Sequence, residues 1–161
     1  MSEAKTDRAI REHVRYVLQG KGAHIDYRAA LADYPLSIIN KKIGELPYTP
    51  WHVLEHMRIA QWDILEFSRN GSHVSPDWPE GYWPAPDEEA DEQKWNETVA
   101  KFLSDLNEME ELLMNPATNL FARIPHGDGQ TILREAILTA DHNAYHLGSL
   151  MTLKKSLASE K

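Results

Sequence analysis

Two stretches of the sequence carry a pair of histidines four residues apart: His52 with His56, and His142 with His146. In an α-helix, residues at this spacing lie on one face about one turn apart, so both rings can reach the same point. Neutral imidazole is a common ligand of zinc, nickel, copper and iron. Each pair could therefore give two nitrogens to one metal ion, with a third ligand from another helix. The alternative is that the histidines are hydrogen-bonded residues of the core.

The apolar residues around the first pair indicate which of its two rings faces inward. They form one arc on a helical projection: Val53, Met57, Ala60, Ile64 and Phe67. His56 lies about 60° from the centre of this arc and His52 about 100° from it. We therefore expect His56 to point toward the interior and His52 to lie toward the rim. His142 and His146 share a partly apolar face of their own helix, so they are not simple surface groups.

Composition limits the chemistry and the class of protein. The 161 residues fit one domain, 1–161, and contain no cysteine, so any metal must bind nitrogen or oxygen ligands. The net charge of −8, with the basic residues scattered, argues against a nucleic-acid partner. Apolar runs are too short to span a membrane, and the N-terminus lacks a secretory signal. We therefore expect no membrane partner and a cytoplasmic protein.

The periodicity of apolar residues predicts an all-α fold with four long helices and one short helical piece. The predicted ranges are 4–18, 27–33, 50–69, 87–114 and 131–157. The helix over 50–69 has the clearest start, with Thr49 as N-cap and Pro50 as first helical residue. No strand or hairpin pattern is evident. These elements predict a four-helix bundle with one long crossover between its second and third long helices.

Residues 72–86 form that crossover, because four prolines exclude a helix or a regular strand. Three aromatic residues lie within it: Trp78, Tyr82 and Trp83. We expect these rings to hold the crossover on the bundle; the alternative is that they line the mouth of a substrate site.

Three segments of the chain resemble the DinB-like (YfiT-like) superfamily of metal-dependent proteins. They are LPYTPWHVLEHMRIAQWDILEFSRN, HGDGQTILREAILTADHNAYHLGSL and, for a subgroup, SPDWPEGYWP. The likeness extends from about residue 11 to residue 153. It implies an up-down-down-up bundle with a three-histidine metal centre. The family's ligands match His56, His142 and His146, whereas His52 matches none.

Three protein nitrogens leave at least one coordination position for water or substrate, which is typical of catalytic sites. Some relatives in the superfamily look like transferases and isomerases that use a small-molecule thiol. We therefore expect a zinc or nickel enzyme, either a thiol-linked transferase or a hydrolase, acting on a small molecule. The alternative is a non-catalytic, stress-related bundle that binds a metal or small ligand. A homodimer is compatible with exposed aromatic residues.

Further side chains could assist the centre. Glu135 shares the face of His142 and could ligate the metal or act as a base, although a peripheral salt bridge is the favoured interpretation. Tyr145 could supply a hydroxyl or simply pack. Asp63 could orient an imidazole, although we expect it to be a solvated carboxylate.

Overall fold

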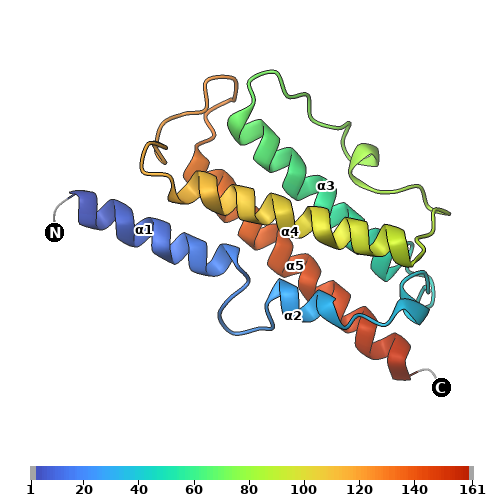
Figure 1. Cartoon of the computed structure of the whole chain (residues 1–161). Helices are drawn as coiled ribbons and strands as arrows, with labels where there is room; N and C mark the ends of the chain where they lie inside the picture. Colours follow the sequence, from blue (N-terminus) through green and yellow to red (C-terminus); the bar gives the residue numbers. More distant parts are fainter. Residues whose placement is uncertain (1–2, 160–161) are drawn as a thin grey trace.

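The computed structural model describes residues 3–159, and every regular element in this part of the chain is helical (Figure 1). The elements are α1 (Glu3–Leu18), α2 (Tyr27–Ala32), the 3-10 turn η1 (Leu36–Ile38), α3 (Pro50–Arg69), the 3-10 turn η2 (Glu80–Tyr82), α4 (Glu92–Met114) and α5 (Ile132–Ser159). The predicted all-α class is confirmed. None of the helices in residues 3–159 has both the length and the apolar character that a membrane crossing needs.

The structure confirms the predicted start of α3 but not that of α4. The start of α3 is as predicted, because Pro50 is its first residue and the Thr49 side chain accepts a hydrogen bond from the backbone of His52. The predicted start at residue 87 is wrong, because α4 begins only at Glu92. The side-chain amide of Asn40 exchanges two hydrogen bonds with the backbone of Ala90. The backbone N–H and C=O of Ala90 are therefore bonded to Asn40 and are not part of the helix.

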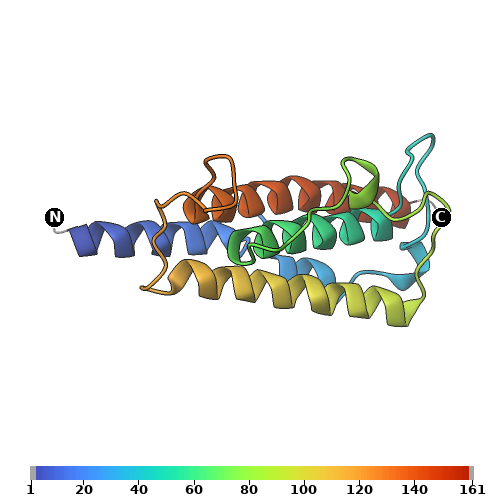
Figure 2. The same cartoon turned by 90° about the horizontal axis from the view of Figure 1, so that it is seen from above.

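The four long helices lie with their axes in broadly the same direction, and α3 packs along both α4 and α5 (Figures 1 and 2). α1 packs on α4 and α5 with its second half, while its first half extends past the other helices (Figure 2). The core is made by apolar side chains from all of them; its largest fully buried members include Trp51, Tyr27, Phe102, Leu18, Leu54 and Met57. The contact between α3 and α5 brings the two histidine-bearing helices together.

The segment that joins α3 to α4, residues 70–91, runs back along α3; we call it the α3–α4 connection (Figure 1). Its hydrogen bonds follow α3 in reverse order. The backbone oxygen of Tyr82 is bonded to His56, and that of Glu88 to His52, one helical turn earlier. The connection therefore covers the face of α3 that carries both histidines. It also contains the short turn η2, which the proline pattern did not predict.

A buried arginine joins α1 to the end of α4. Arg11 is 6% exposed, and its guanidinium donates hydrogen bonds to the backbone oxygens of Leu113, Asn115 and Thr118. The last carbonyls of a helix have no partner within the helix, so a cation that binds them also opposes the negative end of the helix dipole. Asp7, one turn earlier, orients the guanidinium.

Replacing Arg11 by methionine should therefore weaken the fold. We expect Arg11→Met to lower the free energy of unfolding by about 2 kcal/mol, because a charged donor to buried carbonyls is lost while apolar volume is kept. Arg8→Met is the matched control, since Arg8 is exposed and, among the described residues, pairs only with Glu12. Urea unfolding followed by circular dichroism measures both. An equal loss in the two variants would contradict the capping role.

Candidate metal centre

Three histidine rings converge where α3 packs on α5. His56 comes from α3, and His142 and His146 come from successive turns of α5. The Nε2 atom of His56 lies 3.1 Å from Nε2 of His142 and 3.1 Å from Nε2 of His146. One potential ligand atom from each ring lies within 4.8 Å of the other two. The structure therefore brings together the three histidines that the sequence singled out.

The spacing of these nitrogens fits a first-row divalent ion. For bonds of about 2.1 Å, two ligand nitrogens lie about 3.0 Å apart at a right angle and about 3.4 Å apart in a tetrahedron. The observed 3.1 Å separations from His56 lie within this range. Imidazole nitrogens without cysteine sulfur are a donor set that zinc, nickel, copper and iron accept. The residues present therefore fit such an ion.

The proton on His56 is placed by the α3–α4 connection. Nδ1 of His56 lies 2.9 Å from the backbone oxygen of Tyr82, and a carbonyl only accepts, so Nδ1 carries the hydrogen. Nε2 then has a single lone pair, directed at the rings of His142 and His146. One of those rings could donate a hydrogen bond to it, but one lone pair cannot serve two donors well. A cation bound between the three rings would account for both short distances from Nε2 of His56.

Burial keeps the rings uncharged. Burial first, and the neighbouring imidazoles second, lower the pKa of His142 to about 4 and that of His146 to about 3. Burial also lowers the pKa of His56, although the hydrogen bond to the Tyr82 oxygen acts the other way. Because proton and metal compete for the same lone pair, depressed pKa values leave the nitrogens available at neutral pH.

Aromatic rings surround the three histidines. The indole of Trp83, from the α3–α4 connection, stacks on His56 at 3.9 Å between ring centroids and 3° between planes. Tyr145 meets His146 edge to face at 4.9 Å, but it is 72% exposed. Trp83 thus holds the connection against the centre, as predicted for a packing residue. Tyr145 therefore packs against the His146 ring while most of its own side chain stays in contact with solvent.

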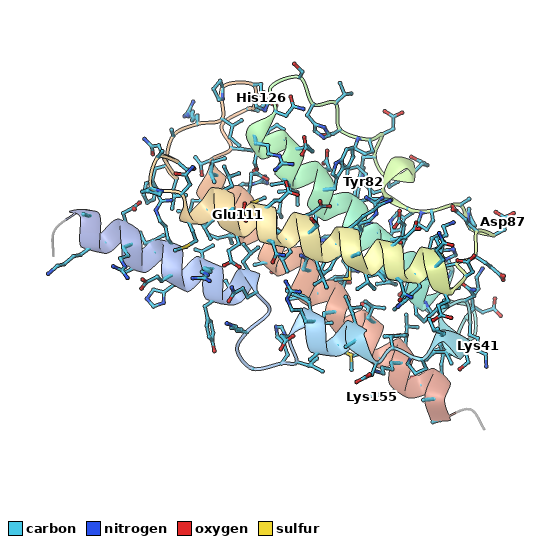
Figure 3. All side chains as sticks on the ribbon, in the orientation of Figure 1. Lys41, Tyr82, Asp87, Glu111, His126 and Lys155 are labelled. Atoms are coloured by element: carbon cyan, nitrogen blue, oxygen red, sulfur yellow. The ribbon has the colours of Figure 1, made fainter. Side chains whose placement is uncertain are left out.

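Asp63 is not the solvated carboxylate that the sequence suggested. It is buried, and it accepts hydrogen bonds from the Tyr82 hydroxyl at 2.6 Å and from Nε2 of His73 at 2.8 Å. Burial, followed by this hydrogen bond to Asp63, raises the pKa of Tyr82 to about 12, so its hydroxyl remains a donor. Figure 3 shows Tyr82 beside α3. Asp63 therefore anchors the residue whose backbone oxygen orients His56.

His52 is not at the rim, although it is also not a ligand. Its side chain is 3% exposed because the α3–α4 connection covers it, which helical angles do not reveal. Nδ1 accepts a hydrogen bond from the backbone N–H of Thr49, and Nε2 donates to the backbone oxygen of Glu88. With both nitrogens used, His52 completes the capping of α3 and takes no part in the three-ring group.

Glu135 forms the salt bridge that was the favoured interpretation. Its carboxylate is buried and lies 2.7 Å from Nη1 of Arg134. Within residues 3–159 it does not belong to the group that could share an ion. Two residues that the sequence reasoning missed are Gln61 and Asn143, both fully buried. The signal for Gln61 was a polar residue four positions after Met57, on the apolar arc of α3.

Comparison of the chain with protein-family models, with curated proteins and with solved structures gives no match.

The metal-free protein should lose stability as the pH falls below 6.5. An unfolded histidine takes up a proton near pH 6.5, whereas folded His142 and His146 do so only near 4 and 3. Between about pH 6.5 and these lower pKa values, the unfolded state binds more protons than the folded state, so the free energy of unfolding decreases as the pH falls. Above about pH 6.5 neither state binds these protons, and the stability that the uncharged rings allow is fully present.

Urea unfolding with a chelator, repeated between about pH 7 and pH 4, measures this dependence. We expect His146→Gln to give a shallower dependence than the parent protein, because a residue that titrates only when unfolded has been removed. His13→Gln, at an exposed position on α1, is the matched control. Equal slopes in the parent protein and His146→Gln would contradict the depressed pKa.

Proposed function

We propose that the chain is a DinB-like protein that holds one divalent ion through His56, His142 and His146 and uses it as a metal-dependent enzyme. The observation that carries the proposal is the meeting of three imidazole Nε2 atoms, with 3.1 Å between His56 and each of the other two. Zinc and nickel fit best among common ions, because both accept three imidazoles and a further ligand. The reaction is of the thiol-linked transferase or hydrolase type.

The arrangement of the helices supports the proposed family. The α3–α4 connection returns along α3, so α4 starts near the end at which α3 starts (Figure 1). α5 then runs back along both (Figure 1). With α1, these directions support an up-down-down-up order for the four long helices. A four-helix bundle of this order, with the long crossover after α3, is what the resemblance implies.

A bound divalent ion supplies Lewis acidity and a free coordination position for a water or a substrate atom. The chain's own residues prepare the site. Tyr82 holds the His56 ring with its Nε2 lone pair toward the centre, and Trp83 fixes the plane of that ring. Burial keeps the imidazoles of His142 and His146 unprotonated at neutral pH.

An apolar hollow near the centre supports a small-molecule substrate. It has a volume of about 410 Å³, and its wall is made by Pro47, Tyr48, His52, Trp83, Pro84 and Pro86. Among residues 3–159 no charged side chain lines it, and the ring nitrogens of His52 are already hydrogen-bonded. Trp83 belongs both to this wall and to the stack on His56. The hollow suits an uncharged apolar part of a substrate or of an external thiol.

One observation favours the non-catalytic alternative. Within residues 3–159 the three-histidine group contains no carboxylate, because Glu135 pairs with Arg134 and Asp63 is committed to Tyr82 and His73. A binding or sensing site needs no general base, whereas hydrolysis usually uses one. Metal binding without turnover is therefore the second candidate.

Metal content tests the site itself. Protein purified without a nickel column should carry about one equivalent of one divalent metal, measured by mass spectrometry of the acid-digested sample. His56→Ala, His142→Ala and His146→Ala should each fall below about one-tenth equivalent, because two imidazoles bind weakly. His13→Ala, at an exposed position on α1, should retain the metal. A metal-free parent protein that also fails to take up added zinc or nickel would refute the proposal.

Turnover separates the two candidate functions. Protein loaded with zinc or nickel is given an activated ester, or a small thiol together with an aryl halide, and product is followed by absorbance. An enzyme should give a rate well above that of His142→Ala, by about 100-fold or more. Stoichiometric metal with the same rate in both proteins would favour the binding module.

A further inference from the structure

A chain of buried side-chain amides links α3 and α5, the two helices of the histidine centre, to α4. Gln61 on α3 and Asn143 on α5 are both 0% exposed. Nε2 of Gln61 donates a hydrogen bond to the backbone oxygen of Phe102 on α4, at 2.6 Å. Nδ2 of Asn143 donates to Oε1 of Gln61, at 2.7 Å. Asn143 directly follows His142 in the sequence, so the chain ends beside the centre.

The direction of this chain is determined by its first member. A backbone oxygen only accepts, so the end of Gln61 that faces Phe102 must be its NH₂ group. The oxygen of Gln61 therefore faces Asn143, which must answer with its own NH₂ group. This removes the usual ambiguity of amide orientation. What remains at the far end is Oδ1 of Asn143, an acceptor.

Two buried atoms of neighbouring residues lack a partner there. Oδ1 of Asn143 and Nδ1 of His142 are both buried, and within the described part of the chain neither completes a hydrogen bond. Leaving such an atom unpaired costs about 1–3 kcal/mol. A carbonyl oxygen and an imidazole N–H are complementary groups.

We propose that Asn143 is a positioning residue whose Oδ1 accepts the Nδ1 proton of His142, so that the Nε2 lone pair of His142 is presented to the centre. Gln61 acts one step further out, because it prevents the amide of Asn143 from turning over. The consequence for metal binding depends on the function proposed above, whereas the tautomer of His142 does not.

The arrangement parallels that of the first ligand. Nδ1 of His56 donates to the backbone oxygen of Tyr82, and Nδ1 of His142 would donate to the side-chain oxygen of Asn143. Both acceptors are carbonyl oxygens of residues that are held by a second polar group: the Tyr82 hydroxyl donates to Asp63, and Nδ2 of Asn143 donates to Gln61. Partners of this kind usually fix the tautomer and ring plane of a metal-binding histidine.

Histidine ¹⁵N chemical shifts of the metal-free protein, recorded at neutral pH with a chelator, test the tautomer directly. Wild-type His142 should carry its proton on Nδ1. In Gln61→Met the amide of Asn143 is free to turn, so we expect His142 to shift toward the Nε2–H form. Asn143→Leu removes the acceptor and should do the same. Thr139→Val is the matched control, because Thr139 is about as buried on α5 but its hydroxyl donates to the Glu135 backbone oxygen, its one partner in the part of the chain that the structure describes.

Zinc affinity, measured by competition with a chromophoric chelator, gives the second readout. Gln61→Met and Asn143→Leu should each weaken binding by about 10- to 100-fold, and Thr139→Val should not. Asn143→Asp keeps an acceptor at His142, so it should retain the Nδ1–H tautomer even though a buried carboxylate lowers stability. If Asn143→Leu does not fold, the tautomer of His142 in Asn143→Asp and in Gln61→Met tests the role of Asn143 instead.

The two proposals fail in different ways. An Nε2–H tautomer of His142 in the wild-type protein would overturn the role of Asn143, whatever the metal content. Unchanged tautomer and zinc affinity in folded Gln61→Met and Asn143→Leu would overturn it as well. A wild-type protein that binds no zinc but shows the Nδ1–H tautomer, lost in both variants, would support the amide chain and refute only the metal site.

Discussion

Three uncharged imidazole rings, each with one nitrogen close to the same point, are the constraint on which this structure depends. The lone pairs of such nitrogens repel each other unless a proton or a cation lies between them. Burial, followed by the neighbouring rings, disfavours a second proton on these imidazoles, because it brings the pKa of His142 to about 4 and that of His146 to about 3. The packing of α3 on α5 then keeps the rings together. Close packing of the core holds α3 and α5 rigidly together, and this rigidity keeps the three rings in place.

The α3–α4 connection is the second structural requirement. It contains four prolines and little regular structure, yet it supplies the backbone oxygen that orients His56 and the indole that stacks on that ring. The carboxylate of Asp63 accepts a hydrogen bond from the Tyr82 hydroxyl and a second one from His73. A loop can position a ligand only when its own backbone is fixed, and here a buried carboxylate and an aromatic stack fix it.

The charge balance of the centre has a chemical consequence. Three neutral ligands leave the full charge of a divalent ion, whereas each carboxylate ligand would cancel part of it. Two carboxylates on the histidine-bearing helices are held in other interactions: Asp63 with Tyr82 and Glu135 with Arg134. An ion in this position would act as a strong Lewis acid toward an incoming oxygen or sulfur atom. The apolar hollow beside Trp83 would limit the water around it.

Much of the helical framework could be predicted from the sequence, because it follows from local rules. Apolar periodicity gave the five helices, Thr49 and Pro50 marked the start of α3, and a spacing of four residues placed His142 and His146 on one face. The same periodicity indicated that His56 points inward. Where a helix start depended on distant contacts, as with Asn40 and Ala90 before α4, the prediction failed.

The sequence by itself determined which imidazoles share a face of one helix, since helix geometry depends only on neighbouring residues; the meeting of His56 with His142 and His146 was implied by the family resemblance. Only the tertiary structure decided how each ring is held. Prolines exclude regular structure from the α3–α4 connection but do not determine its path, and that path buries His52 and Asp63 and brings the Tyr82 oxygen to His56. Which nitrogen of a ring carries the proton depends on an acceptor contributed from elsewhere in the fold, and that acceptor is determined by packing.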